Sequence, residues 1–329
     1  MLNVSQFIAD HITGRQKSMF AADIEANRDK LRAEIEGKRV LVIGGAGTIG
    51  SSYIRAVLPF RPSKLVVVDI SENGLTELTR DLRSTYGMYV PEEYRTYPLS
   101  FADPVFEKIF RAEQGFDIVA NFSAHKHVRS EKDKYSVQAL LENNVLKARK
   151  LLDLLSEFPP RHFFCVSTDK AANPVNIMGA SKRICEMIIQ SYNERSQTDF
   201  VAVRFGNVLG SNGSVIPLFK KQIEAGGPVT VTDPNIIRYF MTIPEAVSLV
   251  IQAGAYAKGG EIFVLDMGAP VKIDTLARNL IKLSGYKPDE DIKVVYTGLR
   301  PGEKLYEEKL MAEEGMTTTP NQLIHIGKP

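Results

Sequence analysis

The run Ser167-Thr168-Asp169-Lys170 places hydroxyl, carboxyl and ammonium groups side by side, a set that can exchange protons with a substrate. The apolar run from His162 to Ser167 that leads into it predicts a buried strand. Ligands of open parallel sheets bind beyond the carboxyl ends of the strands, so Thr168, Asp169 and Lys170 are placed for acid–base chemistry. The alternative is that Asp169 and Lys170 form a solvated turn pair.

A second group of polar residues follows eight residues after Lys170, where Met178-Gly179-Ala180-Ser181-Lys182 opens a predicted helix. This second signal so close along the chain favours a catalytic segment over a solvated turn.

A glycine-rich turn, Gly44-Gly45-Ala46-Gly47-Thr48-Ile49-Gly50, lies between the predicted strand Arg39 to Ile43 and a predicted helix from Ser51 to Leu58. Glycines allow a tight turn and let the backbone approach a pyrophosphate, which then rests on the helix N-terminus. Glycine turns also serve simple strand-to-helix packing. The strand before it and the helix after it favour a dinucleotide site made by Gly44, Gly47, Thr48, Ile49 and Gly50.

Asp69 ends the next predicted strand, near the offset of about 20 residues at which a carboxylate binds the cofactor ribose. A helix N-cap is the alternative role, and the two roles are compatible. Because a carboxylate repels a phosphate on that ribose, Asp69 favours NAD over NADP.

Short apolar strands alternate with amphipathic helices from Arg39 onward, which predicts an α/β protein with a Rossmann-type doubly wound parallel sheet. A helical pattern typical of the covering layers runs from Val137 to Leu155. The predicted strands are Arg39 to Ile43, Lys64 to Val68, Asp117 to Phe122, His162 to Ser167 and Phe200 to Arg204.

A smaller, interwoven C-terminal substrate lobe is expected because glycines and prolines interrupt the chain after Asn207, with short strands at 229–232 and 262–265. We assign 37–206, with 239–266 returning to it, to the nucleotide-binding domain, and 207–238 and 267–329 to the lobe. Residues 1–36 are expected to form a helical extension, with Val4, Phe7, Ile8 and Ile12 at helical spacing and a charged stretch after them.

The composition excludes several other classes of protein. A hydrophobic fraction of 44% in 329 residues is ample for a large core, and a net charge of +2 indicates neither a nucleic-acid nor a membrane surface. Cys165 and Cys185 lie in apolar patterns without metal-ligand spacing, so we expect buried thiols and no metal site. No apolar run approaches the roughly 20 residues of a membrane span, and we expect a cytoplasmic protein.

With Asn173-Pro174 between its halves, the catalytic segment resembles the extended short-chain dehydrogenase/reductase family. Within that family the likeness is to the UDP-N-acetylglucosamine 4,6-dehydratases of polysaccharide biosynthesis, and it covers nearly everything after Lys38. The resemblance implies NAD as cofactor, with Lys182 on the nicotinamide ribose and Thr168 beside the sugar C4 hydroxyl. Asp169 and Lys170 would be the dehydration pair: hydride leaves C4 for NAD, Lys170 removes the C5 proton, Asp169 protonates the departing C6 hydroxyl, and hydride returns to C6.

Met178 departs from the family pattern, which has a tyrosine four residues before the helix lysine. Methionine cannot exchange a proton. A subset of these dehydratases, similar to the bacillosamine and legionaminic acid pathway enzymes, also carries methionine at this position. The resemblance to that subset implies retention of configuration at C5. The departure disfavours the alternative of a UDP-sugar epimerase of the same fold, which needs a proton carrier there. A catalytically silent NAD-binding sensor or scaffold is a further alternative, disfavoured because Thr168, Asp169, Lys170 and Lys182 are all present.

Further residues carry the resemblance downstream. Lys126 and His127 would orient the substrate or merely cap a strand. Separately, the protein is expected to form a homo-oligomer, a dimer or higher. The remaining implied contacts are Ser123 and Ala124 beside the nicotinamide, Asn173 and Asn207 on the nucleotide sugar, Val215 in the backbone that lines the uracil, Arg238 and Arg300 clamping the diphosphate, and Glu303 on ribose hydroxyls.

Overall fold

The computed structural model describes residues 9–14, 21–128, 133–211, 213–309 and 314–327. Val4, Phe7 and Ile8, which were expected to begin an N-terminal helix, lie outside the described residues. Ile12 belongs to a short π-helical turn, η1 (Ala9–Thr13), and two helices follow, α2 (Ala21–Ala26) and α3 (Arg28–Ile35).

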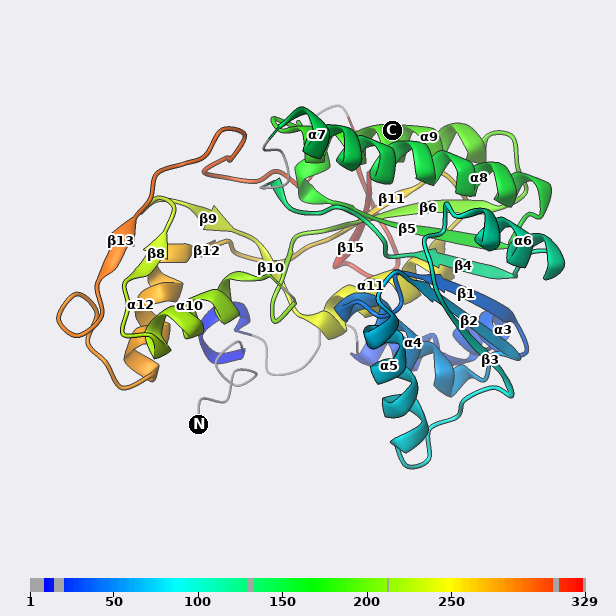
Figure 1. The fold of residues 1–329 in the computed structure, drawn as a ribbon, viewed down its shortest axis with the longest axis horizontal. Helices are drawn as coiled ribbons and strands as arrows, with labels where there is room; N and C mark the ends of the chain where they lie inside the picture. Colours follow the sequence, from blue (N-terminus) through cyan, green and yellow to red (C-terminus); the bar gives the residue numbers. More distant parts are fainter. Residues whose placement is uncertain (1–8, 15–20, 129–132, 212, 310–313, 328–329) are drawn as a thin grey trace.

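A nine-stranded sheet forms the centre of the described part of the molecule, in the order β14-β15-β11-β6-β5-β4-β1-β2-β3 (Figure 1). The strands from β11 to β3 run parallel, whereas β15 and β14 pair antiparallel at one edge. This order confirms the predicted α/β fold. The strands are β1 (Arg39–Ile43), β2 (Lys64–Asp69), β3 (Glu93–Pro98), β4 (Ile118–Asn121), β5 (His162–Thr168), β6 (Asp199–Phe205), β11 (Ile262–Leu265), β14 (Met316–Thr318) and β15 (Ile324–Gly327).

The sequence pattern located all of the doubly buried strands but missed β3. That strand reads Glu-Tyr-Arg-Thr-Tyr-Pro and lies at the sheet edge, where none of its residues is buried. An edge strand needs no continuous apolar run, so the signal that identifies central strands is absent there.

Helices cover both faces of the sheet because successive strand residues point to opposite sides. Val40 and Val42 pack into one apolar layer with α3, α4 (Thr48–Val57), α5 (Glu72–Ser84) and α11 (Ile243–Tyr256). Leu41 and Ile43 pack into the other layer, with α6 (Pro104–Ala112), α8 (Lys147–Glu157) and α9 (Ile177–Asn193). Figure 1 shows α7 (Lys134–Leu141), α8 and α9 together above the sheet, with α4 and α5 below.

The helix expected from Val137 to Leu155 is interrupted by a π-helical turn. The chain forms α7, then η4 (Glu142–Leu146) and then α8. The extra residue in a π-turn rotates the following side chains, and it turns Asn144 into the interior. Periodicity alone does not reveal such a turn, because the apolar pattern continues on both sides of it.

A smaller lobe with its own apolar core lies beside the sheet, at the left of Figure 1. Its helices are α10 (Val215–Glu224) and α12 (Ile273–Leu283). Its short strands pair as β8 (Val229–Val231) with β13 (Val294–Tyr296), and β9 (Ile237–Arg238) with β12 (Val271–Lys272), while β7 (Asn207–Val208) pairs with β10 (Phe240–Met241).

One part of the expected lobe lies elsewhere. Residues 267–329 were assigned to the lobe as a whole, but β14 and β15 extend the main sheet, because β15 pairs with β11 along its length. The other domain limits stay a prediction.

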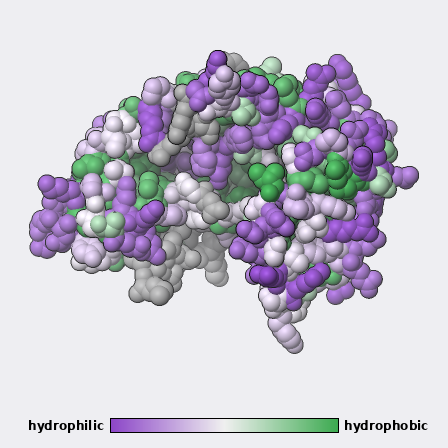
Figure 2. Space-filling model, in the orientation of Figure 1, coloured by the Kyte–Doolittle hydropathy of each residue, from purple (hydrophilic) through white to green (hydrophobic). Residues whose placement is uncertain are grey.

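Hydrophilic residues cover most of the face seen in Figure 2. No helix within the described ranges combines the length and the apolar character that crossing a bilayer requires. Cys165 and Cys185 are buried free thiols, as predicted.

A buried ion network joins β6, α9 and the segment that leads into β14. The Arg204 guanidinium donates to Glu186 (2.8 Å) and Glu314 (2.6 Å), and all three side chains are about 1% exposed. Arg183 also binds Glu314, at 2.7 Å. Burial lowers the pKa of Arg204, but its hydrogen bonds to the two carboxylates outweigh burial and hold that pKa above its usual value.

We expect Arg204→Ala to lower the free energy of unfolding by about 3–5 kcal/mol, because it leaves buried carboxylates without their main counter-charge. Arg55→Ala is the matched control: Arg55 pairs with Asp81 at the surface, where an ion pair contributes about 1 kcal/mol or less. Urea unfolding of both variants measures the difference. Equal losses in the two variants would show that the network does not stabilise the fold.

Candidate active site

The glycine turn after β1 is shaped by close backbone contacts. Gly44 has a φ of +74°, and a Cβ on it would lie 2.8 Å from the Ser123 nitrogen. A Cβ on Gly50 would lie 2.3 Å from the Gly44 carbonyl oxygen. Helix α4 begins at Thr48 directly after Gly47, with no side-chain cap on its first N–H groups. Uncapped N–H groups at a helix start suit an anion, so this turn fits the pyrophosphate of a dinucleotide.

Asp69 ties the end of β2 to this turn. Its carboxylate accepts hydrogen bonds from the Ala46 N–H (3.0 Å) and from the Ser71 N–H (2.9 Å). The N-cap of α5 is Ser71, which accepts from the Gly74 N–H, so the alternative of Asp69 as N-cap is wrong. Each carboxylate oxygen keeps a further lone pair, which leaves Asp69 able to accept from ribose hydroxyls.

Asn144 fixes the chain that follows β4, although sequence reasoning did not single it out. Its side chain bonds both the N–H and the carbonyl of His125, each at 2.9 Å, and donates to Ser181 Oγ at 3.1 Å. The Ser181 hydroxyl in turn donates to the Met178 carbonyl. Asn144 therefore links the strand end carrying Ser123 and Ala124 to the start of α9. The π-turn that aims it inward leaves no mark in the sequence pattern.

Lys126 and His127 are exposed residues of the loop after β4. A Cβ on Gly213 would lie 3.0 Å from Cε1 of His127, so this loop meets the loop before α10. Although Lys126 as a whole is exposed, protein packed around its ammonium group lowers the pKa of that group by desolvation. Their role toward a substrate stays a prediction.

The end of β5 and the short 3-10 turn η5 (Asp169–Ala171) form a compact polar group. Asp169 Oδ1 accepts from Thr168 Oγ1 and from Lys170 Nζ, both at 3.0 Å. Asp169 is 2% exposed and the Lys170 side chain 19%, so the alternative of a solvated turn pair is wrong. Asp169 Oδ2 is buried and has no hydrogen-bond partner among the described residues. Such an oxygen at the carboxyl end of a strand is available to a ligand.

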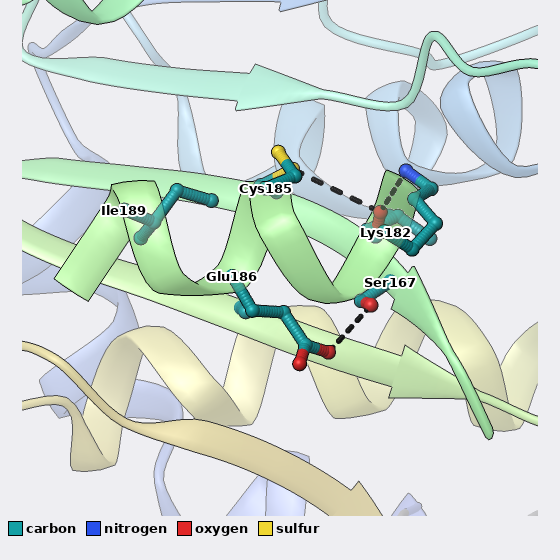
Figure 3. A pocket seen from close by; sticks show the side chains of 8 residues that line it. Ser167, Lys182, Cys185, Glu186 and Ile189 are labelled. Carbon is teal, nitrogen blue, oxygen red and sulfur yellow. Dashed lines mark hydrogen bonds between the residues drawn. The ribbon is translucent and has the colours of Figure 1, made fainter. Parts of the chain in front are cut away.

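Helix α9 packs closely against the Thr168-Asp169-Lys170 group at the position of a glycine, Gly179. A Cβ on Gly179 would lie 2.3 Å from the Lys170 carbonyl oxygen, so only glycine permits the approach. Met178 beside it is 1% exposed. One turn later Lys182 points back toward β5 and donates to the Val166 carbonyl at 2.7 Å (Figure 3). Figure 3 also shows Glu186 on the same helix bound to Ser167. The structure thus places Lys182, Met178 and the Thr168-Asp169-Lys170 group at one helix–strand junction.

The segment 302–308 lies over the loop between η5 and α9. Asn176 donates to the Gly302 carbonyl at 3.0 Å, and Lys304 Nζ donates to the Asn173 carbonyl at 2.8 Å. The Asn173 side chain bonds Glu308. Asn173 therefore lies in the loop between η5 and α9, and its side chain joins that loop to the C-terminal part of the chain.

Glu307 is a buried carboxylate in this segment that sequence reasoning missed. It is 8% exposed, and its Oε1 lies 3.8 Å from Lys170 Nζ and 3.9 Å from Arg238 Nη2. Burial raises the pKa of Glu307; the Lys170 charge opposes this and the Asp169 charge adds to it. Its neighbours in sequence, Tyr306 and Glu308, are exposed, and no motif marks Glu307.

The two predicted clamp arginines differ in their surroundings. Arg238 donates to the carbonyls of Ile237 (2.8 Å) and Leu305 (3.2 Å), and its side chain is 12% exposed. Arg300 is exposed, and its guanidinium makes no hydrogen bond or ion pair with any described residue. Glu303 accepts from the Arg300 N–H at 2.9 Å, which closes the turn between them.

Asn207 and Val215 lie at the entrance to the lobe. The Asn207 side chain donates to the Tyr239 carbonyl at 3.1 Å, and Val215 is the first residue of α10. The positions of Asn207 and Val215 neither support nor contradict their predicted contacts with a nucleotide.

Two relatives show how far the similarity extends. The capsular polysaccharide biosynthesis protein CapD of Staphylococcus aureus is 46% identical over 314 residues, which cover 93% of this chain and 50% of CapD. This chain thus spans about half the length of such curated relatives. A UDP-N-acetylglucosamine 4,6-dehydratase (inverting) of Campylobacter jejuni is 30% identical, covering 86% of this chain and 80% of that protein.

Solved structures share the fold. The X-ray structure of Pen from Bacillus thuringiensis matches with a TM-score of 0.79 and 32% identity, covering 89% of this chain and 88% of Pen. DesIV, a dTDP-glucose 4,6-dehydratase from Streptomyces venezuelae solved with NAD bound, matches with a TM-score of 0.68 and 21% identity, covering 82% of this chain and 87% of DesIV. At that identity the DesIV match shows the fold alone.

The family model for polysaccharide biosynthesis protein matches residues 40–329, which include the glycine turn, the catalytic segment and the lobe, and the chain therefore belongs to the polysaccharide biosynthesis protein family.

Proposed function

We propose that this chain catalyses the NAD-dependent 4,6-dehydration of UDP-N-acetylglucosamine, giving a UDP-linked 4-keto-6-deoxy sugar for bacterial surface glycan synthesis. The observation that carries the proposal is the pair of buried Asp169 and partly buried Lys170 beside Met178. The pair supplies an acid and a base, while the methionine cannot exchange a proton. The name of the Campylobacter relative agrees with a 4,6-dehydration, although that relative is an inverting enzyme and the methionine here favours retention at C5.

The dinucleotide cradle fits NAD. A Cβ at Gly44 or Gly50 would collide with backbone atoms, and α4 presents its first N–H groups without a side-chain cap. Gly47, Thr48 and Ile49 would hold the pyrophosphate, Asp69 the adenosine ribose, and Ser123, Ala124 and Lys182 the nicotinamide end. NAD, when bound, supplies the hydride acceptor and donor that a dehydration without net redox change needs.

The chain's own residues provide the proton transfers. Thr168 would bind the C4 hydroxyl, and Asp169 would take the proton of that hydroxyl, directly or through water, as the hydride leaves C4. Lys170 would remove the C5 proton, which the adjacent C4 carbonyl acidifies. Asp169 would protonate the departing C6 hydroxyl so that it leaves as water. If Lys170 returns a proton to the face of C5 from which it took one, the configuration at C5 is retained. Each group then ends the cycle in the protonation state in which it began, and the Lys170–Asp169 hydrogen bond keeps the two groups next to each other.

The nucleotide would bind between the lobe and the sheet. Arg238 and Arg300 would hold the diphosphate, because the planar guanidinium forms paired hydrogen bonds with phosphate oxygens. Glu303 would bind ribose hydroxyls, and the backbone near Val215 would line the uracil. Asn207, Asn173, Lys126 and His127 complete the proposed contacts, and the active form would be a homo-oligomer.

The reaction is tested by incubating the chain with NAD and UDP-N-acetylglucosamine and measuring the product mass. We expect the loss of one water, with solvent deuterium at C5 in heavy water and a C4 deuterium of the substrate delivered to C6. Lys170→Ala and Asp169→Asn should each lower kcat about 10²–10⁴-fold, as is typical for positioned acid–base groups. Met178→Leu, the matched control, should retain most activity because both side chains are aprotic and similar in volume.

A stereoisomer of unchanged mass would identify an epimerase instead, and nucleotide binding without turnover would identify a sensor or scaffold. Near-native dehydration by Lys170→Ala would contradict the assigned base.

For the cofactor, we expect NAD to bind at least about tenfold more tightly than NADP, because the Asp69 carboxylate repels a ribose phosphate. Asp69→Asn keeps an acceptor for the Ala46 N–H but removes the charge, so the ratio of the two dissociation constants should move toward one. Isothermal titration with both cofactors measures that ratio. Tighter binding of NADP to the native chain would overturn the assignment.

For the diphosphate, Arg300→Ala and Arg238→Ala should each raise KM for the UDP-sugar about tenfold or more, because each removes a charge-assisted hydrogen bond. The kcat of Arg300→Ala should change little, since Arg300 is assigned to the diphosphate and not to the reacting ring. Lys287→Ala, at an exposed site paired with Glu290, is the control. Unchanged KM in both arginine variants would exclude the clamp.

A further inference from the structure

Lys309 lies at the joint between the main sheet and the lobe. Its Nζ donates to Asp266 Oδ1 at 2.8 Å, and Asp266 directly follows β11 at the carboxyl end of that strand. The same Nζ lies 4.6 Å from the ring centroid of Tyr239, which comes just before β10, between the sheet and the lobe (Figure 1). The Lys309 carbonyl accepts from Arg204 at 3.3 Å. Lys309 thus joins the end of the sheet to the chain that enters the lobe.

Both proposed diphosphate ligands are connected to this lysine through the backbone. Tyr239 follows Arg238 directly, and its carbonyl accepts from the N–H and from the side-chain amide of Asn207, each at 3.1 Å. Lys309 belongs to the same stretch of chain as Arg300. The contact between Lys309 and Tyr239 therefore fixes the backbone at Arg238 relative to the stretch that carries Arg300.

The polar contacts of Lys309 are only partly shielded from water. The Lys309 side chain is 26% exposed and the Asp266 side chain 45%, and ion pairs of such exposure add little to the stability of a fold. The hydrogen bond from Lys309 is the main cause that lowers the pKa of Asp266, so the carboxylate is charged at neutral pH. The arrangement therefore suits the orientation of neighbouring groups better than the support of the fold.

We propose that Lys309 is a positioning residue that holds the Arg238 and Arg300 parts of the site together before a nucleotide binds. This inference rests on the proposed assignment of both arginines to the diphosphate. A site that is ordered in advance binds its ligand more tightly, because less conformational entropy is lost on binding. Lys309 would thereby strengthen nucleotide binding without contacting the phosphates.

Binding of UDP, measured by isothermal titration, tests this role without turnover. Lys309→Met removes the charge, keeps a similar chain length and should raise the dissociation constant of UDP about 3–10-fold. Lys309→Arg should stay within about twofold of the native value, because a guanidinium can both bind Asp266 and stack on Tyr239. Lys287→Met, which removes a charge from a surface pair with Glu290, is the matched control and should bind UDP as the native chain does.

Asp266→Asn separates positioning from simple attraction between Lys309 and an anion. If Lys309 acted through its charge alone, loss of the nearby carboxylate would tighten UDP binding. Positioning predicts the opposite sign: an amide holds Lys309 less firmly, so UDP should bind about two- to fivefold more weakly. Tyr239→Leu removes the ring beside the ammonium and should also weaken binding. Tighter binding by Asp266→Asn, or native affinity in Lys309→Met, would overturn the proposal.

Hydrogen exchange detects the same link in the chain without nucleotide. In Lys309→Met, the backbone amides of 237–241 and 300–309 should exchange faster than in the native chain, because both stretches lose a contact that holds them. The urea midpoint should stay close to native, as expected for a partly exposed ion pair. Native exchange rates in both stretches would contradict a positioning role.

Kinetics distinguish this inference from the proposed reaction. In Lys309→Met, KM for the UDP-sugar should rise together with the dissociation constant of UDP, while kcat stays within about twofold of native. A lower kcat with native KM would place Lys309 in the chemical step and contradict a role in binding. If the native chain binds UDP but forms no dehydrated product, the proposed function fails and the UDP affinities still test Lys309. Absence of UDP binding by the native chain would overturn the role of Lys309 as well.

Discussion

Arg204 brings a guanidinium into the interior beside the carboxylates of Glu186 and Glu314, and three parts of the chain depend on this contact. Strand β6 supplies the arginine, α9 supplies Glu186, and the segment leading into β14 supplies Glu314. A buried arginine without both partners would be strongly destabilising, so the three parts are fixed relative to one another. The same Glu186 binds Ser167, two residues before Asp169. The network thus supports the strand end from which the catalytic segment begins.

Two further constraints act at the same junction. Gly179 lets α9 approach the Lys170 carbonyl to a distance that no side chain would allow. Asn144 ties the chain after β4 to the first turn of α9. The groups at the ends of β4 and β5 therefore share one rigid support, which the proposed acid–base catalysis would require because small displacements lower rates steeply. The segment 302–308 adds the lobe to this support through Asn173, Asn176 and Arg238.

The charges near the catalytic segment form a short chain rather than isolated pairs. Asp169 binds Lys170, Lys170 faces Glu307, and Glu307 faces Arg238. The charge of each group is opposite to that of its neighbour, and this compensation lowers the free-energy cost of placing four ionisable side chains in a largely buried region.

The sequence determined the parts of this protein that depend on local order. Central strands were readable because both faces of a parallel sheet are buried and their residues are apolar throughout, and the glycine turn and the catalytic segment were readable because their residues are contiguous. Tertiary structure alone decided the edge strand β3, the inward turn of Asn144, the return of 316–327 to the main sheet, and the place of Glu307 beside Lys170. These features depend on contacts between residues far apart in the chain. No local pattern encodes them, because a strand at an edge, a π-turn inside a helix and a lone glutamate between exposed residues acquire their roles only from what packs against them.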